Sequence, residues 1–195
     1  EYIGYVKDGE VTLKYSTDDY PILMRECRTE DNKVFYKIYE PLNPEKQWRF
    51  SYTPEGLKPK NFINGLRELQ ELFGKLNAQA DDEEDAPARE QKIDEVIICS
   101  GERDALCCRS MGYQPIWFNS ETYQVTEEDI NLLFRYAKVI YNIPDIDSTG
   151  VKKGTELALR HIDVYTIWLP EWLSTFRDNR GKPRKDLRDW QEMRR

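Results

Sequence analysis

The sequence predicts an α/β protein, with a mostly parallel sheet flanked by helices and a small α+β subdomain before it. Residues 94–195 alternate apolar, strand-like runs with helical patterns, and this alternation is typical of a parallel sheet covered on both faces. Residues 1–80 instead hold short, aromatic-rich runs followed by one helical pattern. Residues 81–93 lie between them and are rich in acids, which indicates a solvated linker.

The composition is that of a folded protein with one or two small domains. Of the 195 residues, 39% are hydrophobic and 12% aromatic, so a core can form even though 33% are charged and the net charge is -7. No window of eighteen apolar residues occurs, and the first residues have neither a basic start nor an apolar run. We therefore expect no membrane span, no secretory signal and a cytoplasmic location.

The cysteines and the single histidine exclude several kinds of site. Cys27, Cys99, Cys107 and Cys108 form no C-x-x-C pair, which argues against a zinc ribbon and against a thioredoxin-type redox site. His161 is the only histidine, so His-dependent triads and His-rich metal sites are disfavoured. We interpret the cysteines as reduced thiols and His161 as a charge at the end of a helix.

The first part of the chain is predicted to contain a hairpin and a helix. Its strand-like runs are 11–15, 20–27 and 34–42. A turn between the second and third runs favours a hairpin over 22–40. Leucine and phenylalanine at helical spacing predict a helix over 65–77.

The second part follows the order strand, helix, strand. Its predicted strands are 95–100, 115–118, 138–144 and 164–170. Its predicted helices are 101–112, 126–137, which begins with Thr126 as N-cap, and 155–162. In such sheets the chemistry belongs at the carboxyl ends of the strands.

Two acid-bearing turns fall at predicted strand ends, one over 100–104 and the other over 145–150. Asp145 and Asp147 point the same way if the backbone is extended, with roughly 6 to 7 Å between their side-chain origins. Two unit charges about 6 Å apart repel by roughly 3 kcal/mol at an effective dielectric near 20. A bound cation would remove this repulsion, and ligands that are all oxygens favour Mg²⁺ or Mn²⁺ over Zn²⁺.

Two alternatives exist for these acids. Residues 145–156 match an EF-hand calcium loop at several positions, but the preceding segment is strand-like and Lys152 and Lys153 would place two cations inside the loop. The acids could also simply cap helices, with Asp147 beginning the helix that follows it.

The order of the acidic motifs resembles that of a known family. An apolar strand runs into Gly101 and Asp104 at the start of a helix, and a second apolar strand ends in Asp145 and Asp147, with Gly150 soon after. These stretches resemble the E-G-x-x-D and D-x-D motifs of the Toprim domain, which occurs in bacterial and phage-type primases, in topoisomerases and in some nucleases.

The resemblance covers about residues 94–190. A K-D-x-x-D element common in primase-type members resembles the stretch that contains Lys185, Asp186 and Asp189. The strands before the linker resemble the connecting subdomain of phage-type primase-helicases. A Toprim-like sheet flanked by helices is the fold that the resemblance implies.

One position departs from the Toprim motif. The motif glutamate falls at Ser100, which carries no negative charge and cannot act as a general base near neutral pH. Glu102 lies two positions further on and is the candidate to replace it.

The resemblance implies metal-dependent nucleotidyl transfer, that is, RNA primer synthesis by a primase or primase-helicase. Such chemistry needs positioning and charge neutralisation more than a side-chain nucleophile. The implied catalytic residues are Glu102, Asp104, Asp145 and Asp147, and the implied ligands of Mg²⁺ or Mn²⁺ are Asp145, Asp147, Glu102 and Asp186.

The implied partners are single-stranded DNA, nucleotides, and the zinc-finger and helicase regions of a longer protein, with no membrane. Two alternatives remain open at this stage. Ser100 favours a non-catalytic docking module for nucleic acid or protein, and the family also allows a Toprim-type nuclease.

Basic and aromatic side chains are the candidates for nucleic-acid contacts. The basic candidates are Lys152, Lys153, Arg184, Lys185 and Arg188, with Arg177, Arg180 and Lys182 nearby in the tail. The aromatic candidates are Tyr2, Tyr5, Trp48, Phe50 and Tyr52. The alternatives are a solvated charged surface for the former and core or edge-strand packing for the latter.

Overall fold

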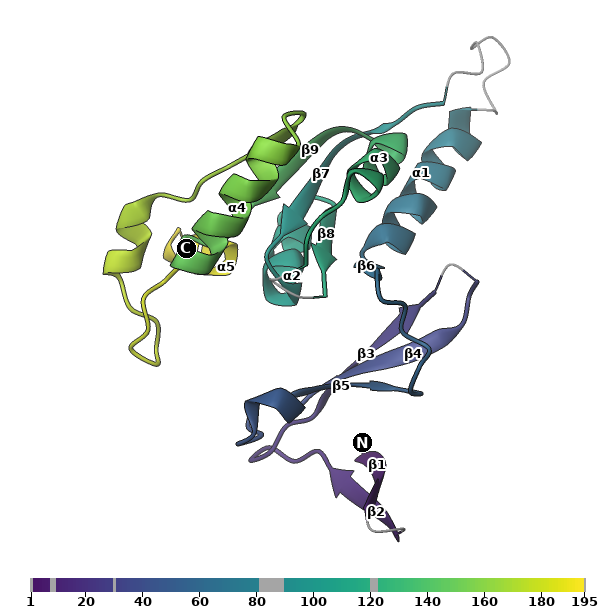
Figure 1. Cartoon of the computed structure of the whole chain (residues 1–195), viewed down its shortest axis with the longest axis vertical. Helices are drawn as coiled ribbons and strands as arrows, with labels where there is room; N and C mark the ends of the chain where they lie inside the picture. The colour runs from purple at the N-terminus through teal and green to yellow at the C-terminus, as the bar shows by residue number, and fades with distance from the viewer. Residues whose placement is uncertain (1, 8–9, 30, 81–89, 120–122, 195) are drawn as a thin grey trace. The chain divides into compact units, whose positions relative to one another are not determined.

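The computed structural model describes residues 2–7, 10–29, 31–80, 90–119 and 123–194. The chain divides into two compact units, residues 1–62 and residues 63–195, which are described one at a time (Figure 1). Most of the predicted linker, residues 81–89, lies outside the described residues.

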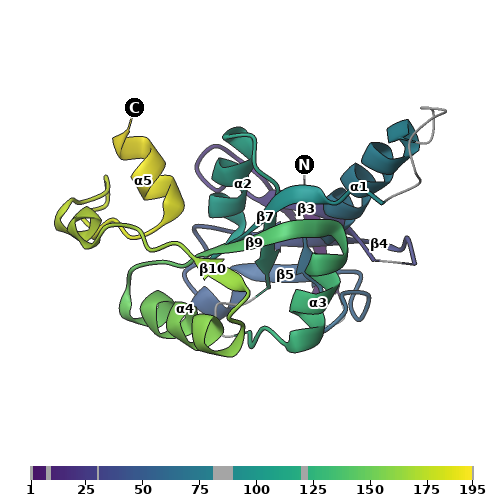
Figure 2. The ribbon, with the colours of Figure 1, turned by 90° about the horizontal axis from the view of Figure 1, so that it is seen from above.

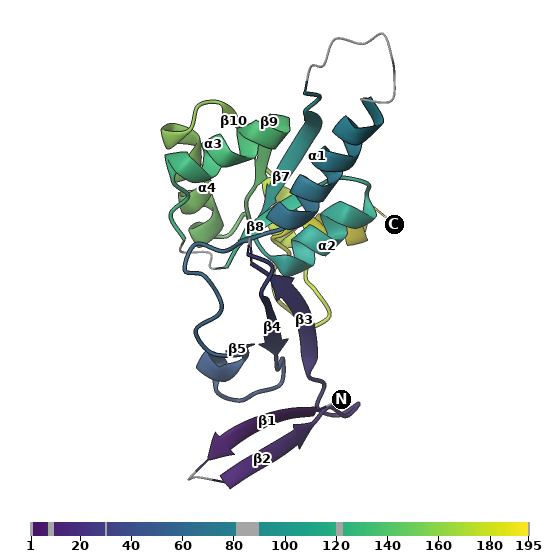
Figure 3. The same cartoon turned by 90° about the vertical axis from the view of Figure 1, so that its right-hand side faces the viewer.

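The first unit consists of antiparallel strands. Its elements are β1 (Tyr2–Lys7), β2 (Glu10–Tyr15), β3 (Leu23–Arg28), β4 (Val34–Tyr39), the short 3₁₀ helix η1 (Lys46–Trp48) and β5 (Phe50–Thr53). Strand β1 pairs with β2, and β3, β4 and β5 form a second sheet in that order (Figure 3). Strands β3 and β4 pair with Arg28 opposite Val34, which confirms the predicted hairpin.

A small aromatic core holds one end of the β3–β4–β5 sheet. Phe35 on β4 is fully buried, and its ring meets Phe62 edge to face with centroids 5.0 Å apart. Tyr52 on β5 lies against the same ring at 6.3 Å. The core-packing interpretation therefore holds for Tyr52. The side chains of Tyr2 and Tyr5 lie outside the described part of the structure.

The second unit is built on a five-stranded sheet with the order β10-β9-β7-β8-β6. Its strands are β6 (Ile63–Asn64), β7 (Ile93–Cys99), β8 (Pro115–Phe118), β9 (Ala137–Ile143) and β10 (Val164–Thr166). Only β6 runs antiparallel to its neighbour, and the other pairs are parallel. The predicted class, a mostly parallel sheet flanked by helices, is confirmed.

Helices cover both faces of this sheet. They are α1 (Leu66–Ala80), α2 (Glu102–Ser110), α3 (Glu127–Tyr136), α4 (Ser148–Arg160), the short η2 (Glu171–Thr175) and α5 (Leu187–Met193). Figure 2 shows α3 and α4 on one side of the strands and α2 and α5 on the other.

The alternation of side chains along β7 explains how both faces are covered. Val96 and Ile98 belong to the apolar cluster beneath α1 and α3, whereas Ile97 and Cys99 belong to the cluster beneath α2 and α5. Successive residues of a strand point to opposite faces, so a continuous apolar run supplies both clusters. None of the described helices is long and apolar enough to cross a membrane.

Helix α4 differs from its predicted counterpart, residues 155–162. It begins at Ser148, with Asp147 as its N-cap, so most of residues 145–156 are helical. The EF-hand alternative is therefore wrong, because an EF-hand loop would be irregular where this segment is a helix. The prediction started too late because two glycines and a pair of lysines interrupt the apolar pattern.

The division between the units also differs from the predicted domain boundary at residue 80. Strand β6 and helix α1 belong to the second unit, which begins at Ile63. Leu69 on α1 is fully buried in the sheet cluster, and Phe73 meets Tyr136 of α3 edge to face at 5.3 Å. The acidic segment marks a connection within the second unit.

Truncation of α1 tests this assignment. Leu69→Ala should lower the free energy of unfolding of the second unit by about 2–5 kcal/mol, because it leaves a cavity under the sheet. Leu72→Ala, one turn away and 42% exposed, is the matched control and should change it little. Urea unfolding followed by tryptophan fluorescence measures both, and equal effects would contradict the assignment.

Candidate functional site

The two acid-bearing turns meet at one edge of the sheet. Strands β7 and β9 are parallel and in register, with Cys99 opposite Ile143, so the segments that follow them emerge side by side. The hydroxyl of Ser100 accepts a hydrogen bond from the backbone N–H of Asp145 at 3.0 Å and lies 3.4 Å from the carbonyl oxygen of Ile143. The residue at the motif glutamate position therefore joins the two strand ends.

Gly150 allows the β9 end to approach α4 closely. A Cβ atom at this position would lie 2.2 Å from the carbonyl oxygen of Asp145, which no side chain can tolerate without a shift of the backbone. A glycine is thus required after the D-x-D motif because the backbones of Asp145 and Gly150 are in contact, and not because of the φ angle of Gly150.

The carboxylates of Asp145 and Asp147 converge on one cation. The ammonium nitrogen of Lys185 lies 2.7 Å from Oδ2 of Asp145 and 2.5 Å from Oδ2 of Asp147. Asp145 is buried, and the side chain of Lys185 is 37% exposed. One oxygen of each carboxylate therefore faces the same position, and a small cation can bind there to both.

The second oxygen of Asp147 has a different partner. Its Oδ1 accepts the backbone N–H of Gly150 at 2.8 Å and so caps α4. Burial acts to raise the pKa of Asp147, but the Lys185 ammonium and the N–H groups at the helix start outweigh burial and lower it. The two carboxylates in turn raise the pKa of Lys185, against the effect of its burial.

The backbone around Lys185 is fixed on both sides. Its carbonyl oxygen accepts the N–H of Ile146 at 2.9 Å, and its own N–H donates to Oδ2 of Asp189 at 2.8 Å. Asp186 caps α5 by accepting the N–H of Asp189 at 2.7 Å. The K-D-x-x-D element is therefore a helix cap that carries Lys185 to the end of β9.

Two further acids lie beside this pair. Asp104 in the first turn of α2 accepts the N–H of Arg188 at 3.1 Å, and Arg103 lies 3.6 Å from Asp186. Burial, then the negative charge of Asp186 and of Asp145, raises the pKa of Asp104 to about 7. Burial and the charges of Asp189 and Asp145 likewise raise the pKa of Asp186.

Mutual repulsion therefore links Asp104, Asp145 and Asp186, which come from three separate segments of the chain. The predicted convergence of acids at this edge of the sheet is found in the structure. Glu102 lies half-buried in the first turn of α2, next to these residues in sequence.

These residues fit a divalent ion in part. Asp145 and Asp147 already converge on a cation, and oxygen ligands suit Mg²⁺ or Mn²⁺. Within the described ranges, however, no three His, Cys, Asp or Glu side chains are grouped closely enough to hold a metal ion. The pair would therefore hold an ion only with water, substrate oxygens or a shifted acid completing its coordination.

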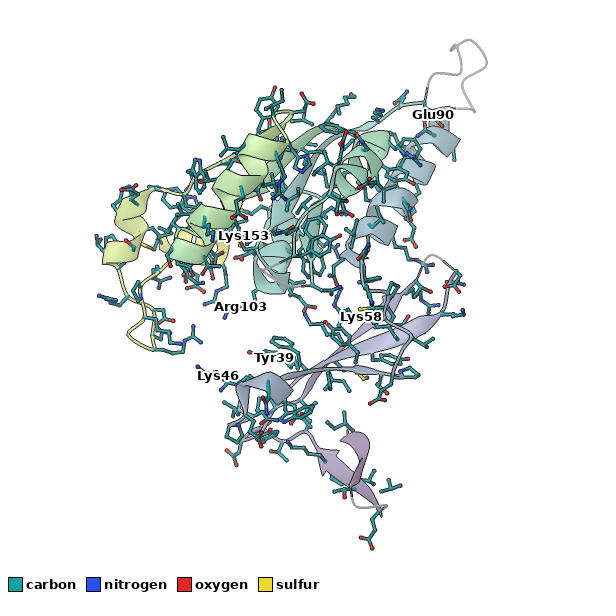
Figure 4. The ribbon with its side chains drawn as sticks, in the orientation of Figure 1. Tyr39, Lys46, Lys58, Glu90, Arg103 and Lys153 are labelled. Atoms are coloured by element: carbon teal, nitrogen blue, oxygen red, sulfur yellow. The ribbon has the colours of Figure 1, made fainter. Side chains whose placement is uncertain are left out.

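The basic candidates are distributed around this edge, and most have acidic partners. Lys153 on α4 pairs with Glu156 at 2.9 Å (Figure 4). Arg184 and Arg188 both contact Glu192, at 2.9 and 3.0 Å. Lys152 on α4 is exposed.

A pocket of about 100 Å³ opens next to the acids on the α4 side of the sheet, and it was not predicted from the sequence. Its wall includes Ser100, Asn142 and Arg160. Phe118 and Tyr123 also line it, with rings stacked 4.9 Å apart. The one signal in the sequence is the polar Asn142 near the end of a mostly apolar strand.

No family model matches the chain, and no curated protein matches it. Among solved structures, the E. coli primase catalytic core matches 86% of this chain and 50% of its own, with a TM-score of 0.55 and 17% identity. The primase fragment of the bacteriophage T7 primase-helicase protein matches 92% of this chain and 61% of its own, with a TM-score of 0.52 and 14% identity.

A DnaG primase catalytic domain bound to single-stranded DNA also matches, with a TM-score of 0.50 and 17% identity over 80% of this chain and 49% of its own. The chain spans about half the length of the primase structures it matches. Its fold is similar to that of about half of a primase catalytic core, which confirms the Toprim-like fold predicted from the motifs.

The raised pKa of Asp104 predicts a pH-dependent stability. Because the folded state holds this proton more tightly than the unfolded state, the contribution of Asp104 to the free energy of unfolding falls as pH rises from about 4 to about 7. Asp104→Asn keeps an acceptor for Arg188 N–H but cannot ionise, so its stability relative to wild type should increase over that range.

The increase is at most about 4 kcal/mol, from 1.36 kcal/mol per pKa unit. Urea unfolding of both proteins at pH 4.5 and pH 8 measures it, and the titrating groups that do not interact with Asp104 cancel in the comparison. A difference between the two proteins that does not vary with pH would contradict the raised pKa.

Proposed function

We propose that this chain is the catalytic part of a primase-type enzyme that makes RNA primers on a single-stranded DNA template. The observation that carries the proposal is the convergence of Asp145 and Asp147 on one cation position, at the carboxyl end of β9, in a primase-type fold. The activity, substrates and partners of the whole protein belong to this proposal, because the chain spans about half of the structures it resembles.

In this proposal Asp145 and Asp147 hold Mg²⁺ or Mn²⁺, and any help from Asp104, Asp186 or Glu102 requires a shift of that side chain toward the ion. A bound ion would neutralise and orient nucleotide phosphates, which is the main requirement of nucleotidyl transfer. The protein's own contribution is rigidity: the Ser100 hydroxyl and the contact at Gly150 fix the backbone of Asp145.

A second candidate function is a docking module without catalysis. Two observations favour it. Ser100 uses its hydroxyl to join strand ends where the motif has a glutamate, and Lys185 already balances part of the charge of the aspartate pair. Such a module would present the Toprim scaffold to nucleic acid or protein without needing a metal ion.

Replacement of Asp145 separates these functions. Asp145→Asn in the full-length protein should lower the rate of primer synthesis at least about 100-fold, because the proposed metal ion, which neutralises the reacting phosphates, loses one of the two carboxylates that hold it. The measurement is Mg²⁺- or Mn²⁺-dependent synthesis of labelled oligoribonucleotides on single-stranded DNA. Asp94→Asn, an exposed acid at the opposite end of the same sheet, is the control and should retain activity.

Full function of the Asp145→Asn protein would contradict the enzymatic proposal and favour the docking module. Metal-dependent cleavage of DNA without any synthesis would instead assign a nuclease.

One face of the β3–β4–β5 sheet has side chains that suit the binding of single-stranded DNA. Strand register places Arg25 and Lys37 in one row across this face, next to the core-packed Tyr52, and Tyr39 beside Phe50 in the next row. The rings of Tyr39 and Phe50 are stacked 4.5 Å apart, and Phe50 is 50% exposed. Aromatic rings with neighbouring cations suit unpaired bases and their phosphates.

The positive charge on this face is concentrated. Lys37 lies 4.9 Å from the ring centre of Phe50, and Lys58 lies 4.4 Å from that of Tyr52 (Figure 4 shows Tyr39 and Lys58). Burial and then the charge of Lys37 lower the pKa of Lys58. An anion at this surface would relieve that repulsion, although the chain as a whole is acidic.

Truncation of Phe50 tests the partner. Phe50→Ala should weaken binding of a fluorescent single-stranded oligonucleotide by about 5- to 100-fold, the range expected when one base loses its stacking partner. Met24→Ala, on the opposite face and similarly exposed, should bind like wild type. Equal binding by all three proteins in fluorescence anisotropy would exclude this face as the docking surface.

A further inference from the structure

The Asp145–Asp147 pair already has a cation of its own. Lys185 contacts both carboxylates through one nitrogen, at 2.7 and 2.5 Å. This contact is not an ordinary surface ion pair, because Asp145 is buried and a single ammonium bridges two acids held by different backbone contacts.

A divalent ion and this ammonium cannot occupy the pair together. Mg²⁺ binds carboxylate oxygens at about 2.0–2.1 Å, so it would need the same oxygens from the same side. Both are positive, and two cations at one site repel strongly. The ammonium leaves the pair with one unbalanced negative charge, whereas a divalent ion balances both carboxylates.

The position of Lys185 makes it an effective competitor. Its backbone is held by Ile146 on one side and by Asp189 on the other, so its ammonium group stays within reach of the pair even when it is displaced. A tethered group competes at a high effective concentration. Only the flexible four-carbon side chain has to move for the exchange to occur.

We propose that Lys185 is the resident cation of the Asp145–Asp147 pair, and that a divalent ion binds there only by displacing it. The inference rests on the proposed function, since it concerns the same metal position. Lys185 thereby balances one of the two negative charges and keeps the carboxylates correctly spaced when no metal is bound, and sets a threshold concentration for metal loading.

Metal binding without any substrate tests the inference. Mn²⁺ is titrated into the full-length protein and unbound Mn²⁺ is followed by electron paramagnetic resonance. Lys185→Met should bind Mn²⁺ at least about tenfold more tightly than wild type, because the competing charge is gone. Lys182→Met, an exposed lysine of the same segment, controls for general removal of positive charge and should shift the affinity less than threefold.

Two further variants keep the test decisive. Lys185→Gln retains a polar side chain and should also bind more tightly, which covers the case in which the methionine variant folds poorly. Adding Asp145→Asn to Lys185→Met should abolish the gain, which locates the ion at this pair. Unchanged or weaker Mn²⁺ binding in both Lys185 variants would overturn the inference.

This outcome is independent of primer synthesis. A protein that shows the gain in Mn²⁺ affinity but makes no primer retains the resident-cation role and loses the proposed enzymatic function. A protein that makes primers, yet shows no gain when Lys185 is replaced, loses only the resident-cation role.

Discussion

The parallel pairing of β7 and β9 determines where every candidate residue of the second unit lies. Because Cys99 and Ile143 are in register, the segments after both strands leave the sheet at the same level. Ser100 can then bind the backbone of Asp145, and α2 and α4 begin at the same edge of the sheet, on opposite faces. The acids gather because the strands end together, and the repulsion that results must be balanced by cations from elsewhere.

Those cations come from the segment before α5 and from α2. Lys185 reaches Asp145 and Asp147, while Arg103 of α2 lies near Asp186. Burial and mutual repulsion still leave Asp104 with a pKa of about 7. The site is thus balanced only in part by its own residues, which is the usual electrostatic state of a site that binds a further charged ligand.

The architecture of the second unit, and the position of Asp145 and Asp147 at a strand end, could be predicted from the sequence. Apolar runs alternating with helical patterns were enough to predict the parallel sheet, and Thr126 was enough to place the start of α3, where it caps the helix as expected. Asp145 and Asp147 could be placed at a strand end because the motif directly follows an apolar run. These features depend on residues close together in the chain.

Features that depend on residues far apart in the chain could not be predicted from the sequence. The salt bridge from Lys185 spans 38 positions to Asp147, and no local pattern reveals it. The apolar periodicity placed the start of α4 too late because Gly150 disfavours a helix locally, while its close contact with Asp145 requires a glycine there. The alternative in which Asp147 caps this helix gave the correct start. The partition of α1 into the second unit likewise follows from packing against α3, which periodicity alone does not show.

The divided role of Asp147 has one more consequence. One of its oxygens holds the first turn of α4 and the other faces the cation. An exchange of ligand at the outer oxygen therefore leaves the helix anchored by the inner one. The cation at Asp147 can therefore be exchanged without unwinding the first turn of α4, because cation binding and helix capping use different oxygens of the same carboxylate.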